Sequence, residues 1–387
     1  MNPIFQLKDL LLYFLKLGAV RFGGPAALVQ TMRQDLIFEK KWFSERDYQV
    51  GLALAQMAPG PLASQLAIYF GWKKSGFWGG FFVLIAFALP AFLLVCLLAH
   101  FYSLYQDFSW LKAVTIGASG CVMALMMKSA IQLAKGVPLK DPIYLFILCA
   151  SALATVIFKS ELGWIFIISG VIAWAHQHYK KQKGLKSLIL FFFSISFLHS
   201  TTSEAQNFWD AIRESMDWKL FQYFFEVGAL VFGSGSVIIP FLYTGVVHEF
   251  HWLSEMQFLD AMMVGMLTPG PMVITVAFVG YLVEGFSGAF LSCLGIFLPC
   301  FLFVVFPAPF FEKMSEHNDL SAALEGMSVA ATGAILGAVW MVAQKTFQHP
   351  VTVAVFIICA LILWKGKKVP DPLLILGSAL TGWIFIS

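Results

Sequence analysis

Two Pro-Gly-Pro motifs have the chemistry to expose backbone groups to a ligand: Pro59, Gly60 and Pro61, and then Pro269, Gly270 and Pro271. Each motif lies in the middle of a long apolar stretch. Proline and glycine interrupt a helix, and the second proline suits the first turn of a new helix. Because lipid cannot satisfy the freed N–H and C=O groups, each break should face protein, water or a substrate. We therefore expect a binding site at these breaks.

Each half of the chain has a second break at matching depth. The first half carries Phe22, Gly23, Gly24 and Pro25, and the second half carries Phe232 and Gly233 followed by Ser234 and Gly235. Four interrupted helices would present free N–H groups and positive dipole ends where the halves meet, and such groups suit an anion. The alternative is that these glycines only allow close helix crossing. Matched breaks in both halves favour the binding site.

Polar side chains flank the breaks. Arg21 directly precedes Phe22, and its planar guanidinium suits a tetrahedral oxyanion, although an arginine here could also snorkel or form an ion pair. Gln56 and Thr268 can supply neutral hydrogen bonds, as can Ser64, Gln65 and Thr275. For Ser64 and Gln65, the alternative is a bond to backbone or to a neighbouring helix.

Charges inside the apolar stretches are few. Lys16 and Glu226 occupy equivalent positions in the two halves, so a pseudo-twofold axis could bring them together as an ion pair or a coupling element. Lys128 has no charged equivalent and is interpreted as marking the end of a span.

The composition identifies an integral membrane protein. Of 387 residues, 59% are hydrophobic and 12% are charged, and the mean hydropathy is +0.79. Soluble domains contain about 25% charged residues. The net charge of +3 indicates no basic surface for nucleic acid. The six cysteines fall in apolar runs without metal-ligand spacing, so we expect neither a metal nor another cofactor.

The chain contains an internal duplication. Gly18 and Gly228, Trp42 and Trp252, and the two Pro-Gly-Pro motifs are all separated by 210 positions. We expect a first transporter repeat at residues 1–180, a connecting span and linker at 181–217, and a second repeat at 218–387. Six spans plus a connecting span would place the second repeat upside down relative to the first. The expected fold is therefore an all-α polytopic membrane protein with about 13 transmembrane segments, built as two inverted repeats with interrupted helices.

The segments expected from hydropathy are residues 8–36, 48–72, 77–104, 109–135, 142–158, 162–178, 185–199, 218–247, 258–283, 286–311, 320–346, 350–364 and 370–387. Counted from the N-terminus, one side of the membrane collects the lysines at 73–74, 135–140, 180–186 and 365–368, so that side should be cytoplasmic. The N-terminus would then be cytoplasmic, with Glu45 and Ser387 outside. The basic residues of loop 33–47 are an objection, and a re-entrant first segment would change the orientation downstream.

These motifs resemble the chromate ion transporter family of the long-chain, two-repeat type. The resemblance rests on Phe22 to Pro25, on Trp42-Phe43-Ser44-Glu45, on Ala53 to Gln56 leading into Pro59 to Leu62, and on Leu89-Pro90, with similar runs in the second half. It implies a multi-pass inner-membrane protein of prokaryotes that exports chromate using the proton-motive force. The second half has Ser234 and Gly235 where the first half has Gly24 and Pro25, so the break after Phe22 and the break after Phe232 need not be equivalent.

The sequence thus predicts a secondary transporter that binds a tetrahedral oxyanion, chromate or sulfate, between its repeats in the lipid bilayer. Transport of sulfate or another anion and an anion channel remain alternatives, because no residue separates chromate from sulfate. The spans offer no convergent acid, base or metal set, so an enzyme is not expected. No Walker motif is present in the sequence to use ATP. Uniport, antiport and a homodimer all stay open.

Overall fold

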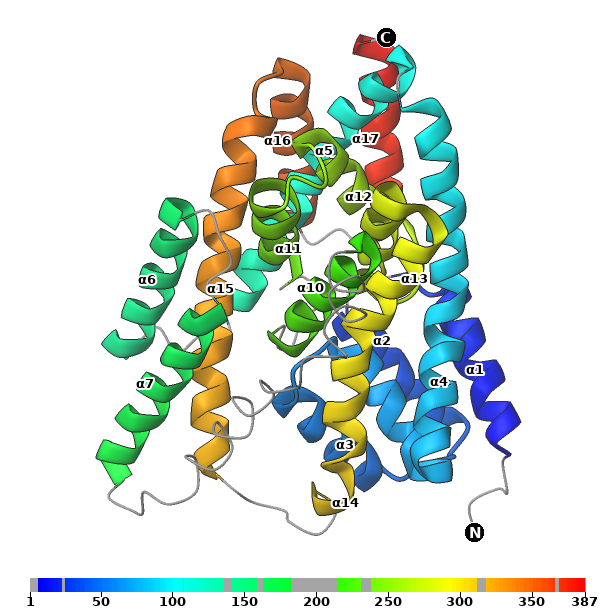
Figure 1. The fold of residues 1–387 in the computed structure, drawn as a ribbon, viewed down its shortest axis with the longest axis vertical. Coiled ribbons are helices and arrows are strands. Elements are labelled where there is room, and N and C mark those ends of the chain that lie inside the picture. Colours follow the sequence, from blue (N-terminus) through cyan, green and yellow to red (C-terminus); the bar gives the residue numbers. More distant parts are fainter. Residues whose placement is uncertain are drawn as a thin grey trace, which may run out of the picture.

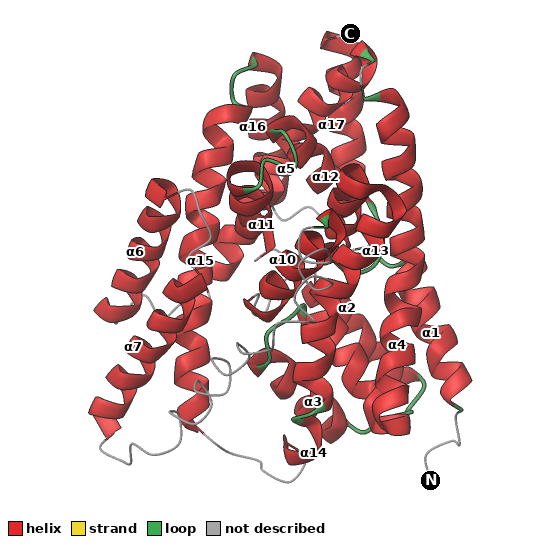
Figure 2. Ribbon diagram, in the orientation of Figure 1, coloured by secondary structure: helices red, strands yellow, loops and turns green. Residues whose placement is uncertain are grey.

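The computed structural model describes residues 6–22, 25–106, 108–135, 141–158, 163–181, 215–230, 238–311, 318–365 and 369–386. Figure 2 shows that these residues form helices joined by short loops, with no strand among them. The all-helical fold is therefore confirmed. The expected connecting span at 185–199 lies outside the described residues.

The helices follow the same order in both halves. The first half has α1 (Leu7–Val20), α2 (Pro25–Arg33) continued by the π-helical η1 (Gln34–Glu39), α3 (Glu45–Met57), α4 (Leu62–Tyr105), α5 (Ser109–Lys135), α6 (Pro142–Phe158) and α7 (Gly163–Lys181). The second half has α10 (Met216–Leu230), α11 (Ile238–Phe241), η3 (Leu242–Glu249), α12 (Glu255–Leu267), η4 (Met272–Ile274), α13 (Thr275–Val305), α14 (Ala308–Phe311), α15 (Asn318–Thr346), α16 (Pro350–Trp364) and α17 (Asp371–Ile386).

Four helices are long and apolar enough to cross a bilayer. They cover Leu62–Tyr105, Ser109–Lys135, Met272–Val305 and Glu325–Thr346, and three shorter apolar helices accompany them. Large apolar side chains such as Trp364 and Phe385 are exposed on the outside of the helices. This surface belongs against lipid, which agrees with a membrane protein.

The first Pro-Gly-Pro motif lies at the tip of a helical hairpin. Lys73 Nζ in α4 lies 3.3 Å from Asp47 Oδ1 in α3, and the rings of Phe43 and Phe70 are 4.6 Å apart. A continuous helix would place Asp47 and Lys73 about 40 Å apart. The chain therefore reverses between them, and α3 with residues 62–74 forms what we call the first inner hairpin, whose first tip is residues 58–61.

The helix α4 itself reverses a second time. Ser75 and Gly76 leave helical geometry, with Gly76 at φ +62°. A Cβ placed on Gly80 would lie 3.2 Å from the carbonyl oxygen of Ile68, which requires the arm at 77–105 to run back along the arm at 62–74. The helix α4 thus has two antiparallel arms, and only the second is long enough to cross the membrane.

The second half repeats both reversals. Glu284 and Gly285 interrupt α13 as Ser75 and Gly76 interrupt α4, and Thr275 abuts Gly265. We call residues 255–284 the second inner hairpin and residues 268–271 the second tip. The outer pairs also fold back: Tyr13 in α1 donates to Asp35 in η1 (3.0 Å). In the second half, Tyr223 in α10 donates to the carbonyl oxygen of Phe241 in α11 (2.6 Å).

These contacts differ from the expectation that segments 8–36 and 48–72 each cross the membrane. Hydropathy measures the length of an apolar stretch and not its direction, so one span and two half-length arms give the same signal. The expectation that Glu45 and Lys73 lie on opposite sides of the membrane is wrong, because Asp47, two residues beyond Glu45, pairs with Lys73. The basic residues of loop 33–47 thereby join the side that carries Lys73 and Lys74, which removes the objection that they raised.

The last two helices of each half pack on the other half. In Figure 1, α6 and α7 lie along the long helix α15, and the contacts agree. A Cβ on Gly337 of α15 would lie 2.6 Å from the carbonyl oxygen of Ala152 in α6, and one on Gly120 of α5 would lie 2.5 Å from that of Thr352 in α16. Glycine lets these backbones approach closely. This exchange holds the inner hairpins of both halves in one helical body.

Candidate functional site

Capping interactions hold the base of each inner hairpin. Ser44 caps α3 by accepting from the N–H of Asp47, and Ser254 caps α12 by accepting from that of Gln257. In each case the third residue of the helix accepts from the N–H of the capping serine in return, which is a capping box. The repeated Trp-x-Ser-Glu motif therefore starts the arm that leads to each tip.

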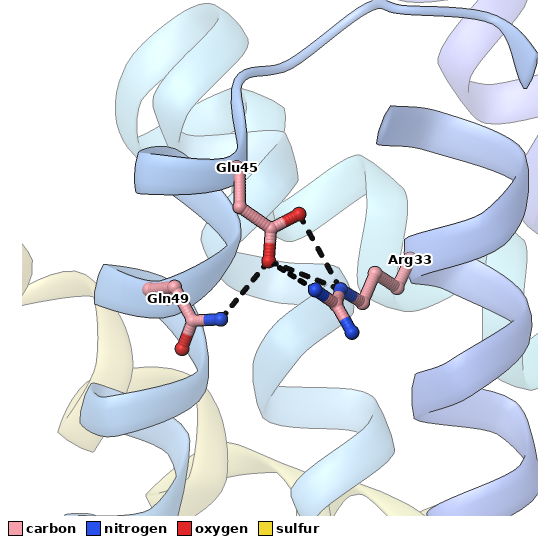
Figure 3. A network of polar contacts seen from close by, with 3 residues as sticks. All are labelled: Arg33, Glu45 and Gln49. Carbon is pink, nitrogen blue, oxygen red and sulfur yellow. Dashed lines mark hydrogen bonds and ion pairs between the residues drawn. The ribbon is translucent and has the colours of Figure 1, made fainter. Parts of the chain in front are cut away.

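A charged contact fixes the base of the first inner hairpin further. Arg33 at the end of α2 donates to Glu45 at 2.6 Å and 3.0 Å, and Gln49 donates to the same carboxylate at 3.0 Å (Figure 3). The hydrogen bond from Arg33 lowers the pKa of Glu45 below its usual value. This contact joins α2 to the first inner hairpin, outside the apolar part of the helices.

The first tip is closed by a glutamine. Gly60 is buried at φ +131°, a conformation that favours glycine. The Gln65 amide nitrogen donates to the carbonyl oxygens of Ala58 (3.0 Å) and Pro59 (2.7 Å). The amide therefore satisfies two carbonyl groups that the Pro-Gly-Pro break frees from helical bonding.

Two polar atoms at the first tip are left without a partner. Ser64 Oγ and Gln65 Oε1 belong to fully buried side chains and make no hydrogen bond to the described residues. The helix α4 begins beside them at Leu62, and the preceding Pro61 supplies no side-chain cap to the first N–H groups. Buried polar atoms are almost always hydrogen-bonded, and an unmet one costs about 1–3 kcal/mol. These two atoms therefore have hydrogen-bonding capacity left for a polar ligand or water.

The second tip is satisfied by the protein itself. Gly270 has φ +94°, Thr268 Oγ1 donates to the carbonyl oxygen of Gly265 (3.2 Å), and Thr275 Oγ1 donates to that of Met272 (2.9 Å). The N–H of Gly270 donates to the carbonyl oxygen of Arg21 (3.1 Å). Because that bond engages the Gly270 N–H, this group is not available to an anion in this conformation.

Each tip docks against the opposite half. A Cβ on Gly60 would lie 3.0 Å from both Cβ and Sγ of Cys300 in α13, and one on Gly270 would lie 3.1 Å from Ala91 in α4 and 3.2 Å from the carbonyl oxygen of Gly18 in α1. The structure thus brings together residues that lie far apart in the sequence. Arg21 and Gly270 meet through their backbones, as convergence of the breaks predicts.

The remaining predicted residues lie around these tips. Arg21 and Phe22 end α1 with exposed side chains, and Arg21 makes no ion pair with the described residues. Gln56 is exposed at the end of α3, Pro25 begins α2, and the prolines Pro61, Pro269 and Pro271 are buried beside their glycines. The predicted residues Gly23, Gly24, Phe232 and Gly233 lie outside the described residues.

The predicted ion pair is not found among the described residues. Lys16 and Glu226 are both exposed, and Glu226 accepts instead from Gln222 (3.1 Å). Equivalent positions face each other only when they lie close to the symmetry axis, whereas α1 packs along α4 and α10 along α13. Lys128, which has no charged equivalent in the other half, forms an ion pair: its Nζ lies 3.2 Å from Asp371 Oδ1 at the start of α17.

Sequence reasoning missed one buried acid. Asp260 in α12 is 2% exposed, and its carboxylate accepts from Tyr102 in α4 (2.7 Å) and from Thr115 in α5 (2.5 Å). The available signal was an aspartate inside the apolar segment expected at 258–283. These bonds join the second inner hairpin to two helices of the first half.

Comparisons with known proteins agree with the duplicated pattern. The sequence pattern of the family described as chromate transporter matches residues 8–174 and again residues 218–383. The chain is 40% identical to the chromate transport protein of Cupriavidus metallidurans over 99% of this chain and 94% of that one. It is 41% identical to the probable chromate transport protein of Synechococcus elongatus over 100% and 97% of the two chains. The chromate transport protein of Pseudomonas aeruginosa is 27% identical over 99% and 93%. No solved structure matches this chain.

Proposed function

The chain belongs to the chromate transporter family, and from this premise we propose that it is a secondary transporter that exports chromate under the proton-motive force. The relatives that it matches over nearly their full length are named as transport proteins. The proposed substrate site lies at the inner hairpin tips, at membrane depth between the two halves.

The main support for this site is that two buried polar atoms beside the first tip have no hydrogen-bond partner among the described residues. The Ser64 hydroxyl can donate to an oxyanion, and so can the uncapped N–H groups at the start of α4 beside it. Gln65 Oε1 is an acceptor and would accept a hydrogen bond from water or from the O–H of a protonated oxyanion. Arg21, whose carbonyl oxygen accepts from Gly270 of the second tip, adds an exposed positive charge at that tip and makes no ion pair with the described residues.

The arrangement of the long helices supports inverted repeats. The second arm of α4 and α13 run antiparallel, since Phe77 contacts Phe301 (5.1 Å between ring centroids) whereas Phe92 contacts Phe286 (5.8 Å). Hairpins that enter from opposite faces, each with its tip docked against a long helix of the other half, would give the alternating access of a transporter. We further propose an inner-membrane location with the N-terminus and loop 33–47 in the cytoplasm and the C-terminus outside.

The energetics permit outward movement of a divalent oxyanion. For a dianion that leaves a cell with a negative interior, the membrane potential contributes roughly 2 × 2.3 kcal/mol per 100 mV. Uniport outward is therefore possible in principle, and an exchange against protons would add the energy of the pH gradient. Sulfate has the same shape and charge as chromate, and it is the rival substrate.

The test is transport by purified protein in lipid vesicles. We expect saturable chromate flux that an opposing proton gradient drives uphill, with sulfate and molybdate as competitors of measured affinity. Protein-free vesicles and the Ser64→Ala variant are the controls. Flux that does not saturate and only follows the chromate gradient would indicate a channel, and flux of sulfate without chromate would reassign the substrate.

A further inference from the structure

The acid Asp260 has an environment unlike that of the paired carboxylates in this protein. Its side chain is enclosed by helices of both halves, and each carboxylate oxygen accepts one hydroxyl: Oδ2 from Tyr102 and Oδ1 from Thr115. By contrast, Asp47, Glu45 and Asp371 each pair with a basic side chain.

No cation compensates the charge of Asp260 in the described part of the chain. Of the elements that pack against α12, α4 presents Tyr102 and α5 presents Thr115, whereas α13, α17, η3 and η4 present no charged or titratable group that acts on the carboxylate. A buried carboxylate without a counter-charge is costly, and ionisable residues at membrane depth serve in ion pathways and proton relays. Its presence therefore calls for a function.

The surrounding hydroxyls can satisfy Asp260 both with and without a proton. When the carboxylate is charged, Tyr102 and Thr115 both donate to it. Thr115 Oγ1 also lies 3.1 Å from the carbonyl oxygen of Leu111, which is a second acceptor. When Asp260 holds a proton, Thr115 can donate to Leu111 and accept from Asp260, while Tyr102 keeps its bond. The protonation state can thus change without movement of the heavy atoms.

We propose that Asp260 binds and releases the proton that couples transport to the proton gradient, an inference that rests on the transport function proposed above. The carboxylate takes up a proton from water on one side of the membrane and returns it to water on the other side, and no electrons are transferred. Asp260 lies about 10 Å along α12 from Leu267, which directly precedes the second tip. Its protonation changes a charge-assisted contact between this hairpin and the first half into a weaker neutral one.

A proton fits this site better than a metal ion. Hard cations such as Ca²⁺ take about 6–8 oxygen ligands whose lone pairs face the metal. Here both hydroxyls direct their protons at the single carboxylate, and the described residues contain no cluster of three or more acidic, histidine or cysteine side chains. The arrangement recognises a carboxylate that alternates between charged and neutral forms.

The principal experiment compares two kinds of chromate flux in vesicles that contain the purified Asp260→Asn variant. The asparagine has nearly the same shape and cannot titrate. We expect chromate–chromate exchange at equal pH to continue and accumulation driven by a pH gradient to be lost. The matched control is Asp371→Asn, whose acid also contacts α5 but is paired with Lys128, and it should keep the gradient-driven accumulation. Retention of gradient-driven accumulation by Asp260→Asn would overturn the proposal.

Two further variants test the proposal if Asp260→Asn does not fold. Tyr102→Phe and Thr115→Val keep the carboxyl but each removes a donor that favours its charged form, so the proton should be held more tightly and released at higher pH. Infrared titration of the protonated carboxyl measures this shift without any chromate. An unshifted titration in both variants would overturn the assignment, whereas a wild-type protein that titrates but moves no chromate would contradict the proposed function alone.

Discussion

The two inner hairpins have the same backbone but different side chains at their tips. Positions 56, 64 and 65 of the first hairpin are Gln56, Ser64 and Gln65, whereas the equivalent positions of the second are Met266, Ile274 and Thr275. Two buried polar atoms beside the first tip have no hydrogen-bond partner among the described residues, whereas the threonine hydroxyls at the second tip donate to backbone carbonyl oxygens. Both copies thus contain the Pro-Gly-Pro break, whereas buried polar atoms without a described partner occur beside the break of the first copy.

The buried acid shows the opposite division. Asp260 belongs to the second inner hairpin, and Val50 occupies its equivalent position in the first. Its partners Tyr102 and Thr115 correspond to Phe311 and Leu324 in the second half. All three positions of this polar cluster are therefore occupied by apolar residues at the repeat-equivalent positions. We infer that the two hairpins divide the work: the first provides contacts to the oxyanion and the second carries the proton.

The largest expected effect comes from changing the glycines that both tips share. Gly60→Ala and Gly270→Ala each force a side chain into positive φ, which costs about 1–3 kcal/mol. Gly60→Ala should reduce the yield of folded protein more, because its new Cβ would lie 2.9 Å from the Gln65 amide nitrogen and 3.0 Å from Cys300, whereas that of Gly270 would lie 3.1 Å from Ala91 and 3.2 Å from the carbonyl oxygen of Gly18. Detergent-solubilised yield and Tm measure this difference.

Equal yields for the two alanine variants would show that the tips tolerate a side chain equally. Because both glycines are required by backbone conformation, a loss of folded protein does not exclude contact with the anion. Affinity must therefore be measured on the fraction that folds.

The next effect concerns Arg21, which only the first half possesses, since Val231 is its equivalent. Arg21→Lys keeps the charge but removes the planar fork, so chromate affinity should fall while Tm stays close to that of the wild type. The side chain is exposed and makes no ion pair with the described residues, so the fold does not depend on it. Titration of chromate flux measures the change, with Lys16→Gln, which removes another exposed positive charge from α1, as the control. Normal affinity in Arg21→Lys would remove the guanidinium from the site.

Much of this architecture was predictable from the sequence, and the exceptions have physical causes. The breaks at Gly60 and Gly270 and the duplication were predicted because local residue types specify them. The reversal of each broken segment was not, because only tertiary contacts such as that between Asp47 and Lys73 give the direction of an arm. The pairing of Lys16 with Glu226 failed for a related reason: a constant offset gives equivalence, not proximity.

A smaller effect distinguishes the two tips by their hydroxyls. Ser64→Ala removes a buried hydroxyl that has no described partner, so folded protein should be unchanged or slightly more stable, while chromate affinity falls. Thr275→Val in the second tip removes a hydrogen bond to the backbone, so it should lose about 1 kcal/mol of stability and keep its affinity. Chemical denaturation and flux titration on both variants measure the two outcomes. The opposite pattern would transfer the substrate contacts to the second tip.

The smallest effect lies at the hairpin bases, where the comparison is electrostatic. In the first half Arg33 holds Glu45, whereas in the second half Tyr243 replaces the arginine and Glu255 lies 3.7 Å from Lys345 instead. The bond from Arg33 lowers the pKa of Glu45, so its stabilisation is present above the unfolded pKa of a glutamate and is lost as the pH falls through the lower folded value. Arg33→Gln should therefore lower Tm slightly at neutral pH and less in acid, and added salt should reduce the difference because the pair is exposed.

Lys345→Gln is the matched change in the second half and should have still less effect, since its contact is longer and its side chain more exposed. A Tm difference for Arg33→Gln that does not shrink in acid would show that the arginine acts through its packing against Phe38 and Tyr48 and not through Glu45.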